Sequence, residues 1–407
     1  MMMMTVLNQK VAALFKLPPG RMLTYLTGYP FARLGKQTPR VHAIHSELRW
    51  IRAAIGYLKL LGESQLPDMD PQFLQEVRNY YHPVGHYIHP DDYRIFFHLT
   101  GQKNKKFISN YLFHNHVMSV LNPAGLESNL MDKNVYSRIY SEFRQPETLL
   151  RYMRGAFYNA KYRMISSAEA ERVLLNAEIE WVIKPSRFSN SGTGVFTGSS
   201  SGGKIVMNGA ERSLGYFRNN YPEGFIIQER VKQSEHLSVF HPGSLNTLRV
   251  FTLRLGSEIV TLPGTYARFG RGGNHVDNMG SGGVGCGVSA GGELTPRGIS
   301  NDLKWVERHP DTGIVFSGRK LPFYAEVMSF VTEMHRVTPK IGLASWDIAI
   351  DEKDEPVLIE INTFYPSSFT PQLLNGPFFG EYTDAVLDHT IRKKTPLSGA
   401  PPEGSYS

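Results

Sequence analysis

Apolar and polar residues alternate in two short segments near the end of the chain, residues 345–351 and 357–362. A period of two is typical of β-strands, whose successive side chains point to opposite faces. The five residues between these segments are mostly charged and end in Pro356, which indicates a turn. The pattern therefore predicts an antiparallel hairpin.

Polar side chains gather on one face of this hairpin. Pairing about the turn sets Asp347 opposite Glu360, with Cβ atoms about 5 Å apart. We expect Leu358, Glu360 and Asn362 to share one face of the second strand. Two carboxylates this close repel unless something positive lies between them. Such oxygen ligands suit Mg²⁺ or Mn²⁺, so Asp347, Glu360 and Asn362 are candidate metal ligands. The alternative is an edge hairpin with a solvated polar face.

Three cationic residues interrupt apolar, strand-like segments upstream of the hairpin: Lys184, Arg249 and Arg268. A charge within an apolar segment is costly unless it meets an anion. Arginine in particular suits bidentate contact with phosphate or carboxylate. A single residue of this kind is usually on the surface, but three in one region indicate an anionic ligand.

The segment 189–194 follows the Lys184 strand and consists mostly of Ser and Gly. The backbone N–H groups of such a loop can close over phosphate oxygens. The segment is not a Walker A motif, because no Gly-Lys-Ser/Thr follows, and it lacks the Gly-x-Gly-x-x-Gly spacing of a dinucleotide fold. An ordinary hairpin turn is the alternative.

The remaining pattern predicts a mainly helical region over residues 1–124, followed by mixed helices and strands. Asp70 precedes Pro71 in the arrangement of a capped helix start. Beyond this region we expect further helices and one mobile, glycine-rich loop. The helices are expected at residues 136–143, 147–160, 167–175, 322–337 and 383–394, and the loop at 270–300. The tail, residues 395–407, is rich in Pro, Gly and Ser and is expected to be disordered.

Composition narrows the possible partners. A chain of 407 residues accommodates two or three domains, and its net charge of +7 favours anionic partners. No basic run or nucleic-acid motif is present, so we expect no nucleic-acid partner. The single Cys286 excludes an internal disulfide, fits a reducing compartment and is interpreted as a small buried thiol. No signal peptide or spanning segment is evident, so we expect a cytoplasmic protein. Contact of an amphipathic N-terminal helix with a membrane surface is left open.

The order of these segments resembles the ATP-grasp superfamily. The first lysine of that family matches Lys133, and the strand-borne lysine matches Lys184. The Ser/Gly loop, an adenine-contacting segment at 228–231, an Arg-bearing strand and an Asp…Glu-x-Asn set follow in the same order. The resemblance covers about residues 125–392. The segments 241–250 and 276–283 are similar to the sugar-transfer-associated group, which is related to alpha-L-glutamate ligases.

The resemblance implies an α+β fold in which ATP lies between the antiparallel sheets of two α+β subdomains. It assigns this fold to residues 125–394, after the helical region 1–124. It also implies ATP with Mg²⁺ or Mn²⁺ as cofactors. The implied phosphate contacts are Lys133, Lys184, Ser189, Ser191, Gly192 and Gly194. The implied adenine and ribose contacts are Gln228, Glu229, Val231, Glu235 and His236. Arg249 and Arg268 are the implied catalytic cations, and Asn246, Asp277 and Asn278 the implied substrate contacts.

The chain departs from better-known amino-acid ligases of this superfamily, which often carry an Arg just before the first metal-binding Asp. Here Ala344 and Ser345 stand in that region, so the cation must come from elsewhere. The resemblance implies an ATP-dependent carboxylate–amine ligase that forms an acyl phosphate, acting on a sugar acid or amino acid in surface-polysaccharide synthesis. A kinase acting on a hydroxyl group and a non-catalytic nucleotide-binding scaffold are the alternatives. The acceptor, the amine and the oligomeric state stay open.

Overall fold

The structure is a computed structural model and describes residues 56–62, 65–84, 88, 90–123, 130, 132–187, 192–364 and 366–394. Within these residues the chain forms two compact units. One contains the chain up to Val120 and from Glu381 onward, and the other runs from Leu121 to Gly380. No helix of the described residues is long and apolar enough to span a membrane.

The first unit is helical. Helix α4 begins at Pro71, because the Asp70 side chain accepts a hydrogen bond from the Gln72 N–H and proline fits the first turn. The phenolic groups of Tyr81 and Tyr93 both donate to the Phe107 carbonyl, which closes the core of this unit. Its elements are α4 (Pro71–Tyr81), η3 (His82–Val84), α5 (Pro90–Thr100), α6 (Asn110–Leu112), the π-helix η4 (Phe113–Val117), α7 (Met118–Leu121) and α14 (Thr383–Lys394).

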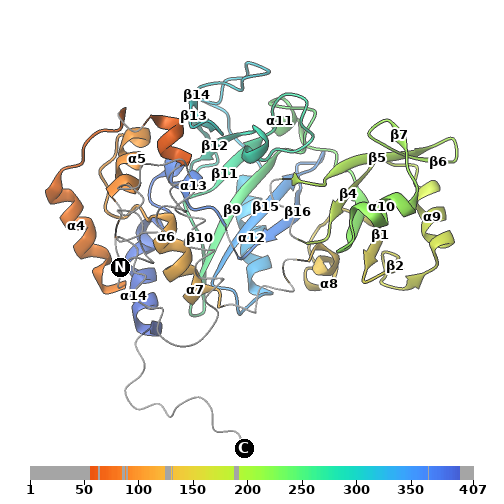
Figure 1. The fold of residues 1–407 in the computed structure, drawn as a ribbon, viewed down its shortest axis with the longest axis horizontal. Helices are drawn as coiled ribbons and strands as arrows, with labels where there is room; N and C mark the ends of the chain where they lie inside the picture. Colours follow the sequence, from red (N-terminus) through yellow and green to blue (C-terminus); the bar gives the residue numbers. More distant parts are fainter. Residues whose placement is uncertain are drawn as a thin grey trace, which may run out of the picture. The chain divides into compact units, whose positions relative to one another are not determined.

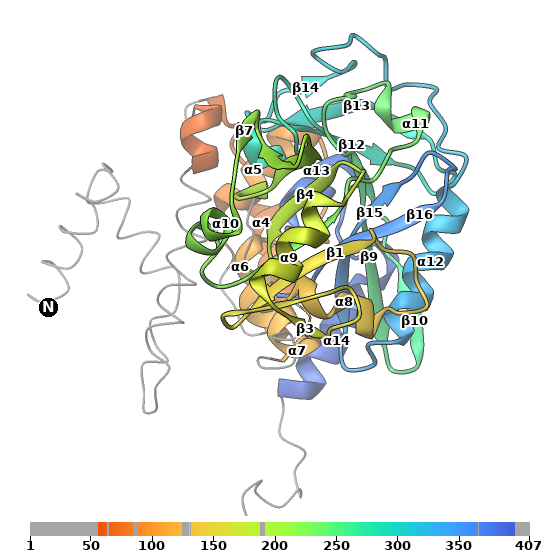
Figure 2. The same cartoon turned by 90° about the vertical axis from the view of Figure 1, so that its right-hand side faces the viewer.

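The second unit contains two antiparallel sheets (Figure 1). The first sheet has the strand order β3-β2-β1-β8-β4-β5-β6-β7. Helices α9 and α10 pack on one of its faces, visible in Figure 2, through Leu174 and Phe217. The strands are β1 (Thr148–Met153), β2 (Ala156–Tyr158), β3 (Met164–Ile165), β4 (Trp181–Pro185), β5 (Phe196–Ser201), β6 (Lys204–Met207), β7 (Ala210–Glu211) and β8 (Phe225–Glu229). The helices near it are η5 (Lys133–Val135), α8 (Tyr136–Ile139), α9 (Ser167–Leu175) and α10 (Leu214–Asn220).

The second sheet has the order β14-β13-β12-β11-β9-β15-β16, with β10 paired to β9. Its strands are β9 (Thr247–Leu255), β10 (Glu258–Thr261), β11 (Tyr266–Phe269), β12 (Val284–Val288), β13 (Leu294–Ser300), β14 (Trp305–Val306), β15 (Leu343–Ile350) and β16 (Pro356–Asn362). The helical elements near it are α11 (Glu235–Ser238), η7 (Met279–Ser281), α12 (Tyr324–Arg336), α13 (Phe369–Asn375) and η8 (Gly380–Tyr382).

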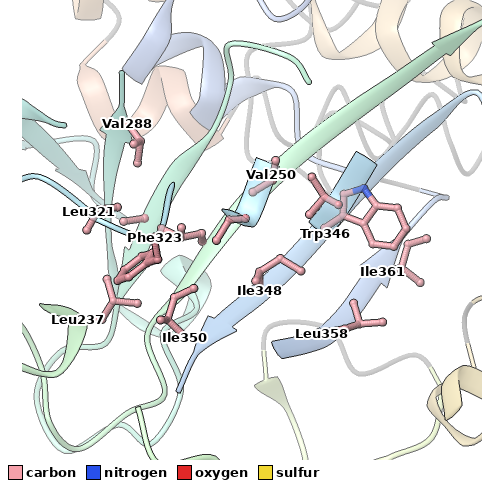
Figure 3. Close-up of a cluster of buried hydrophobic side chains, with 14 of the residues drawn as sticks. Leu237, Val250, Val288, Leu321, Phe323, Trp346, Ile348, Ile350, Leu358 and Ile361 are labelled. Carbon is pink, nitrogen blue, oxygen red and sulfur yellow. The ribbon is translucent and has the colours of Figure 1, made fainter. Parts of the chain in front are cut away.

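One face of the second sheet is buried in the largest core cluster of the unit (Figure 3). Trp346, Ile348 and Ile350 alternate along β15 and enter this cluster, together with residues of helix α12. Ser345 and Asp347 occupy the intervening positions and therefore belong to the opposite face. Burial of the apolar face fixes the register of β15, because a slip of one residue would move every side chain to the wrong face.

The predicted hairpin is confirmed, and it contains one irregularity. Asp347 pairs with Glu360, as expected, but Ile348 pairs with Leu358, so Ile359 is an extra residue on β16. Leu358 lies in the core cluster, whereas Glu360 is paired with Asp347 on the opposite face. The expectation that Leu358 and Glu360 share a face is therefore wrong. A β-bulge at Ile359 breaks the alternation between them.

Two further expectations are wrong. Residues 147–160 form the hairpin β1–β2 and not a helix, and its turn is Arg154–Gly155, where both residues have positive φ. The stretch 270–300 contains strands β12 and β13 and not only a loop. Glycines are used there for close packing: a Cβ on Gly287 would lie 2.7 Å from Asn375 Oδ1. The glycine at this position thus reflects close packing and not backbone mobility.

The helices expected at 167–175, 322–337 and 383–394 are present as α9, α12 and α14. Helix α14 belongs to the unit that contains α4 and α5, whereas the sequence placed it at the end of the second domain. The helix expected at 136–143 is shorter and ends at Ile139. The expected disordered tail, 395–407, and most of the N-terminal region lie outside the described residues.

Candidate active site

Asp347 lies on the face of the second sheet opposite the core cluster, on the strand between β9 and β16. In the register of the sheet it pairs with Arg249 of β9 on one side and with Glu360 of β16 on the other. Arg249 donates from Nε to Asp347 Oδ1 at 2.7 Å and from Nη2 to Oδ2 at 2.6 Å. This bidentate geometry fixes the guanidinium plane as well as its charge. No arginine stands just before Asp347 in the sequence, but Arg249 of the neighbouring strand lies beside it.

A second arginine completes the environment of Asp347. Arg268 of β11 donates from Nη1 to Asp347 Oδ2 at 3.0 Å and from Nη2 to Asp277 Oδ1 at 2.5 Å. The other oxygen of Asp277 accepts from the Thr247 hydroxyl. Both terminal nitrogens of Arg268 are therefore held by carboxylates, and its side chain is only 7% exposed. Arg249 is 16% exposed, and its Nη1 donates none of the hydrogen bonds found here.

The pKa values in this group reflect burial and ion pairing. Burial acts to raise the pKa of Asp347, but Arg249 and Arg268 outweigh it and lower the pKa to about 2. Burial also acts to lower the pKa of Arg249, and Asp347 outweighs it, so the net shift is upward. Asp277 differs, because burial exceeds the effect of Arg268 and its pKa is raised. Asp347 is therefore a permanent anion that two guanidinium groups neutralise.

Two lysines lie near Glu360, which pairs with Asp347. One is on the first sheet and the other is on the helical turn that precedes it. Lys133 of η5 is 4% exposed and donates to Glu360 Oε1 at 2.6 Å. The backbone N–H of Lys133 donates to the Ser186 carbonyl, which ties η5 to the end of β4. Lys184 lies on β4, between Ile183, which enters the core, and Pro185. Strand alternation therefore turns Lys184 away from the core.

The ammonium of Lys184 has no hydrogen bond or ion pair with any residue that the structure describes. The side chain is nevertheless buried, with the residue 8% exposed. Burial and the neighbouring Lys133 lower its pKa from 10.5 to about 7, and Glu360 only partly opposes them. Four cationic side chains in this group face three carboxylates, because Lys133, Lys184, Arg249 and Arg268 are matched by Asp277, Asp347 and Glu360. With Lys184 protonated, the group carries an excess of one positive charge.

Residues 112–386 match the family described as sugar-transfer associated ATP-grasp. The chain belongs to this family. No curated protein matched the sequence. This assignment confirms the superfamily and the narrower group expected from the sequence, and with them the α+β fold of two antiparallel sheets.

Several solved structures of ligases are similar to this chain at low identity. A D-alanine–D-alanine ligase from Bacillus anthracis is 14% identical, with 65% of this chain and 68% of that chain covered and a TM-score of 0.35. D-alanyl-alanine synthetase A from Vibrio cholerae O1 biovar eltor str. N16961 is 14% identical, with 66% and 67% covered and a TM-score of 0.37. An L-amino acid ligase from Bacillus licheniformis is 11% identical, with 66% of this chain but 49% of that chain covered and a TM-score of 0.35.

The donor chemistry of the ATP-grasp site fits a hard divalent cation. Asp347 and Glu360 supply carboxylate oxygens from paired positions, and Glu360 is 24% exposed. The amide nitrogen of Asn362 is buried and has no hydrogen-bond partner within the described part of the chain. Rotation of this amide exchanges its nitrogen and oxygen, so an oxygen can take the orphaned position. Oxygen donors of this kind suit Mg²⁺ or Mn²⁺.

The expected adenine-contacting segment connects the two sheets. Gln228 and Glu229 lie at the end of β8, and their side chains bond to the segment before β1: Gln228 Nε2 donates to the Pro146 carbonyl and Glu229 Oε1 accepts from the Glu147 N–H. Five residues after Glu229, the Ser234 N–H donates to the Ile350 carbonyl at the end of β15. The side chains of Gln228 and Glu229 thus form hydrogen bonds within the protein. Val231 lies two residues beyond the end of β8.

The expected ribose contacts lie at the start of α11. Glu235 is exposed in its first turn, and His236 Nε2 lies 3.8 Å from Asp354 Oδ2. The ring centroids of His236 and Phe323 are 6.0 Å apart. Glu235 and His236 directly follow the segment that connects the two sheets. They therefore lie near the second sheet.

Two of the three expected substrate contacts have structural roles. Asn246 is fully buried, and its amide bonds to Gln233 and to the carbonyls of Leu237 and His241. Its oxygen accepts from the Ser244 hydroxyl and the Gly270 N–H. Asn278 caps the short helix η7 through the Gly280 N–H. The third, Asp277, holds Arg268, as described above.

The structure describes only part of the expected phosphate loop. Ser189 and Ser191 lie outside the described residues. Gly192 and Gly194 both have positive φ, near 72° and 77°, which glycine adopts without strain. A Cβ on Gly192 would lie 2.9 Å from the methyl carbons of Val276, next to Asp277. The end of this loop therefore touches the loop that carries Asp277.

Three residues of the site were missed from sequence. Thr247 lies two positions before Arg249 on β9 and shares its face, so strand alternation could have identified it. Ser345 pairs with Asn362, and its buried hydroxyl has no partner among the described residues. Ile359 gave no signal, because nothing in its apolar surroundings marks a bulge. Cys286, by contrast, is a buried thiol as expected, with a pKa raised by burial to about 12.

Proposed function

We propose that this chain is an ATP-dependent carboxylate–amine ligase that uses Mg²⁺ or Mn²⁺. The observation that carries the proposal is the buried ammonium of Lys184, which lies beside Lys133 and has no partner among the described residues. A polyphosphate would supply the missing anion and remove the cost of burying Lys184 as a charge. Membership of the ATP-grasp family supports ATP as that polyphosphate.

The proposed nucleotide contacts follow the two sheets. Lys133 and Lys184 would bind phosphate oxygens, with the loop ending at Gly192 and Gly194 alongside. The backbone near Gln228, Glu229 and Val231 would contact the adenine, and Glu235 or His236 the ribose. Asp347, Glu360 and Asn362 would hold the metal ion. When bound, the ion would neutralise phosphate charge and fix the geometry of the transferred group.

The proposed reaction has two steps. The acceptor carboxylate attacks the γ-phosphorus of ATP, forming a P–O bond while the bond to the ADP oxygen breaks. The amine nitrogen then attacks the carbonyl carbon of the acyl phosphate, and inorganic phosphate leaves as the amine loses a proton. Nη1 of Arg249 donates no hydrogen bond to any described residue, and the side chain is 16% exposed, so Arg249 would meet the transferred phosphoryl group or the acceptor. Arg268 would act through Asp347 and Asp277, which occupy its terminal nitrogens.

We further propose a sugar acid or an amino acid as the acceptor, in the synthesis of a surface polysaccharide, and a cytoplasmic location. The family name, sugar-transfer associated ATP-grasp, supports the first of these. A direct screen of compounds would identify the acceptor and the amine. Acceptors would be tested for ADP release with Mg·ATP, and the products identified by mass spectrometry. A new amide with free phosphate supports the ligase, whereas a phosphorylated hydroxyl group would assign a kinase instead.

Nucleotide binding provides a test that needs no acceptor. Lys184→Met should weaken binding of Mg·AMP-PNP at least about tenfold, because it removes a charge-assisted phosphate contact. Lys204→Met is the matched control, since Lys204 is exposed and pairs with Glu211 on the neighbouring strands β6 and β7. Calorimetry would measure both affinities. Equal affinities for the two variants would remove the phosphate role of Lys184.

Metal-shell variants test the catalytic part of the proposal. Asp347→Asn and Glu360→Gln each remove one negative charge and nearly keep the shape of the side chain. We expect turnover to fall by at least about a hundredfold in each, with a folded protein as judged by circular dichroism. Near-normal turnover in either variant would exclude that carboxylate as a metal ligand.

A further inference from the structure

The carboxylates assigned to the metal are already engaged by cations of the chain itself. Three hydrogen bonds from Arg249 and Arg268 end on the two oxygens of Asp347, at 2.6 to 3.0 Å. An ionised carboxylate has about four lone-pair positions, so one remains. Glu360 accepts from Lys133 at 2.6 Å. A divalent cation that approached these oxygens would meet guanidinium and ammonium groups at the same positions.

We infer that the free protein lacks a working divalent-cation site, and that the site forms only when nucleotide and metal enter together and exchange partners with Arg249 and Lys133. This inference rests on the proposed function. In the free protein, Arg249 pairs with Asp347 and Lys133 with Glu360. With nucleotide bound, the phosphates take the cations, and the two carboxylates are released to the metal ion. The ion pairs of the free protein thus keep the carboxylates in place and masked.

The charge balance of the group favours this order. With Lys184 protonated, the four cations and three carboxylates leave an excess of one positive charge. A bare divalent cation would raise this excess to three, in a site whose ionised groups are mostly buried. ATP carries about four negative charges at neutral pH, so ATP alone would leave about three negative charges in excess. The complex of the two leaves about one. Buried net charge is costly, so joint entry is the least unfavourable route.

The competing pairs are strong enough to matter. Charge-assisted, bidentate contacts between arginine and carboxylate are among the strongest side-chain hydrogen bonds. Asp347 is 6% exposed and Lys133 is 4% exposed, so water screens these pairs little. Removing one partner of a buried pair leaves the other charge in search of a counter-ion. A variant without Arg249 should therefore accept the metal ion that the wild-type protein excludes.

The experiment measures Mn²⁺ binding to the full chain by electron paramagnetic resonance, without nucleotide and with AMP-PNP. In the wild-type protein we expect Mn²⁺ affinity to be at least about thirtyfold higher with AMP-PNP. Arg249→Gln should raise the nucleotide-free Mn²⁺ affinity at least about tenfold, because it frees Asp347. Adding Asp347→Asn to that variant should remove the gain, which locates the site. Arg254→Gln is the matched control, since Arg254 lies on the same strand but donates to the His335 carbonyl.

A second variant tests the same inference if Arg249→Gln fails to fold. Lys133→Met frees Glu360 and should raise nucleotide-free Mn²⁺ affinity in the same direction, with Glu360→Gln removing the gain. Tight Mn²⁺ binding to the wild-type protein without nucleotide, lost in Glu360→Gln, would overturn the inference. Unchanged Mn²⁺ affinity in the folded variants would overturn it as well. Failure of AMP-PNP to bind under any condition would instead remove the proposed function, so the two failures are distinguishable.

Discussion

Individual side chains of this site are matched by charge, and Lys184 is the exception. Its pKa of about 7 in the folded protein lies below the 10.5 of an ordinary lysine. Between these two values the unfolded chain binds a proton that the folded chain does not. The free energy of unfolding contributed by Lys184 therefore rises with pH from about 7 and levels off near the ordinary lysine value. Below pH 7 the folded protein bears the full cost of the buried charge.

We predict a pH-dependent effect of Lys184→Met in the absence of ligand. The variant should be more stable than the wild-type protein by about 1–3 kcal/mol at pH 6, since it removes a buried, unpaired charge. The difference should shrink steadily as pH rises from 7 to 10. Urea denaturation at a series of pH values measures it. A difference that stays constant across this range would mean that Lys184 is not the titrating group.

The ion pair of Arg268 and Asp277 allows a second test at this scale. Asp277→Asn should lower the free energy of unfolding by about 2–4 kcal/mol, because Arg268 is then buried with one counter-ion fewer. Arg268→Gln in the same chain should cost less than the sum of the two single changes. A double-mutant cycle in urea measures the coupling, expected at about 1 kcal/mol or more. Strict additivity would show that the two residues do not act as a pair.

At the scale of elements, close contacts between strands and helices set the tolerance of the fold. Gly198 of β5 pairs with Trp181 of β4, and a Cβ on Gly198 would lie 2.2 Å from the Trp181 ring. Trp181 is fully buried, so its ring cannot move aside freely. The glycine is thus required by its neighbour and not by backbone conformation.

We therefore predict that Gly198→Ala lowers the stability of the protein by about 2–3 kcal/mol, through overpacking at Trp181. Gly215→Ala is the control, since a Cβ there meets only Ser213 Oγ at 3.5 Å within helix α10. Alanine also favours helix over glycine, so the control should be neutral or slightly stabilising. Thermal denaturation compares the two variants. An equal melting temperature for both would contradict the packing argument.

The elements also show what the sequence could and could not predict. The Asp347–Glu360 pairing followed from alternation about a polar turn, and the capped start of α4 followed from Asp70. The prediction of a helix over 147–160 was wrong, because the turn at Arg154–Gly155 makes this segment a hairpin. The expectation of a mobile loop failed at β12, where Gly287 packs closely against Asn375 and Thr295. Such tertiary contacts are not visible in local sequence. The sequence singled out Arg249 and Arg268 as cations, but not their hydrogen bonds to Asp347.

At the scale of the whole molecule, every described candidate for nucleotide, metal or substrate contact belongs to the unit from Leu121 to Gly380. Ligand binding stabilises the residues it contacts and those coupled to them. We predict that Mg·AMP-PNP slows amide exchange in β4, β15 and β16 at least about tenfold, and leaves α4 and α5 unchanged. Hydrogen–deuterium exchange with mass spectrometry measures both regions. Protection of α4 or α5 would reveal coupling between the two units.

The extra residue on β16 has a consequence for genetics. If Ile359 were deleted, Leu358 and Glu360 would become neighbours and would still pair with Ile348 and Asp347 in an unbroken ladder. The core cluster does not include Ile359, so the deletion removes little packing. What it removes is the local bend, together with a half-buried apolar side chain next to Glu360. Because a bulge re-aims the side chain beside it, loss of this one codon should change the direction of Glu360. We expect a separation-of-function allele, whose product accumulates in the cell at normal levels and turns over substrate more slowly.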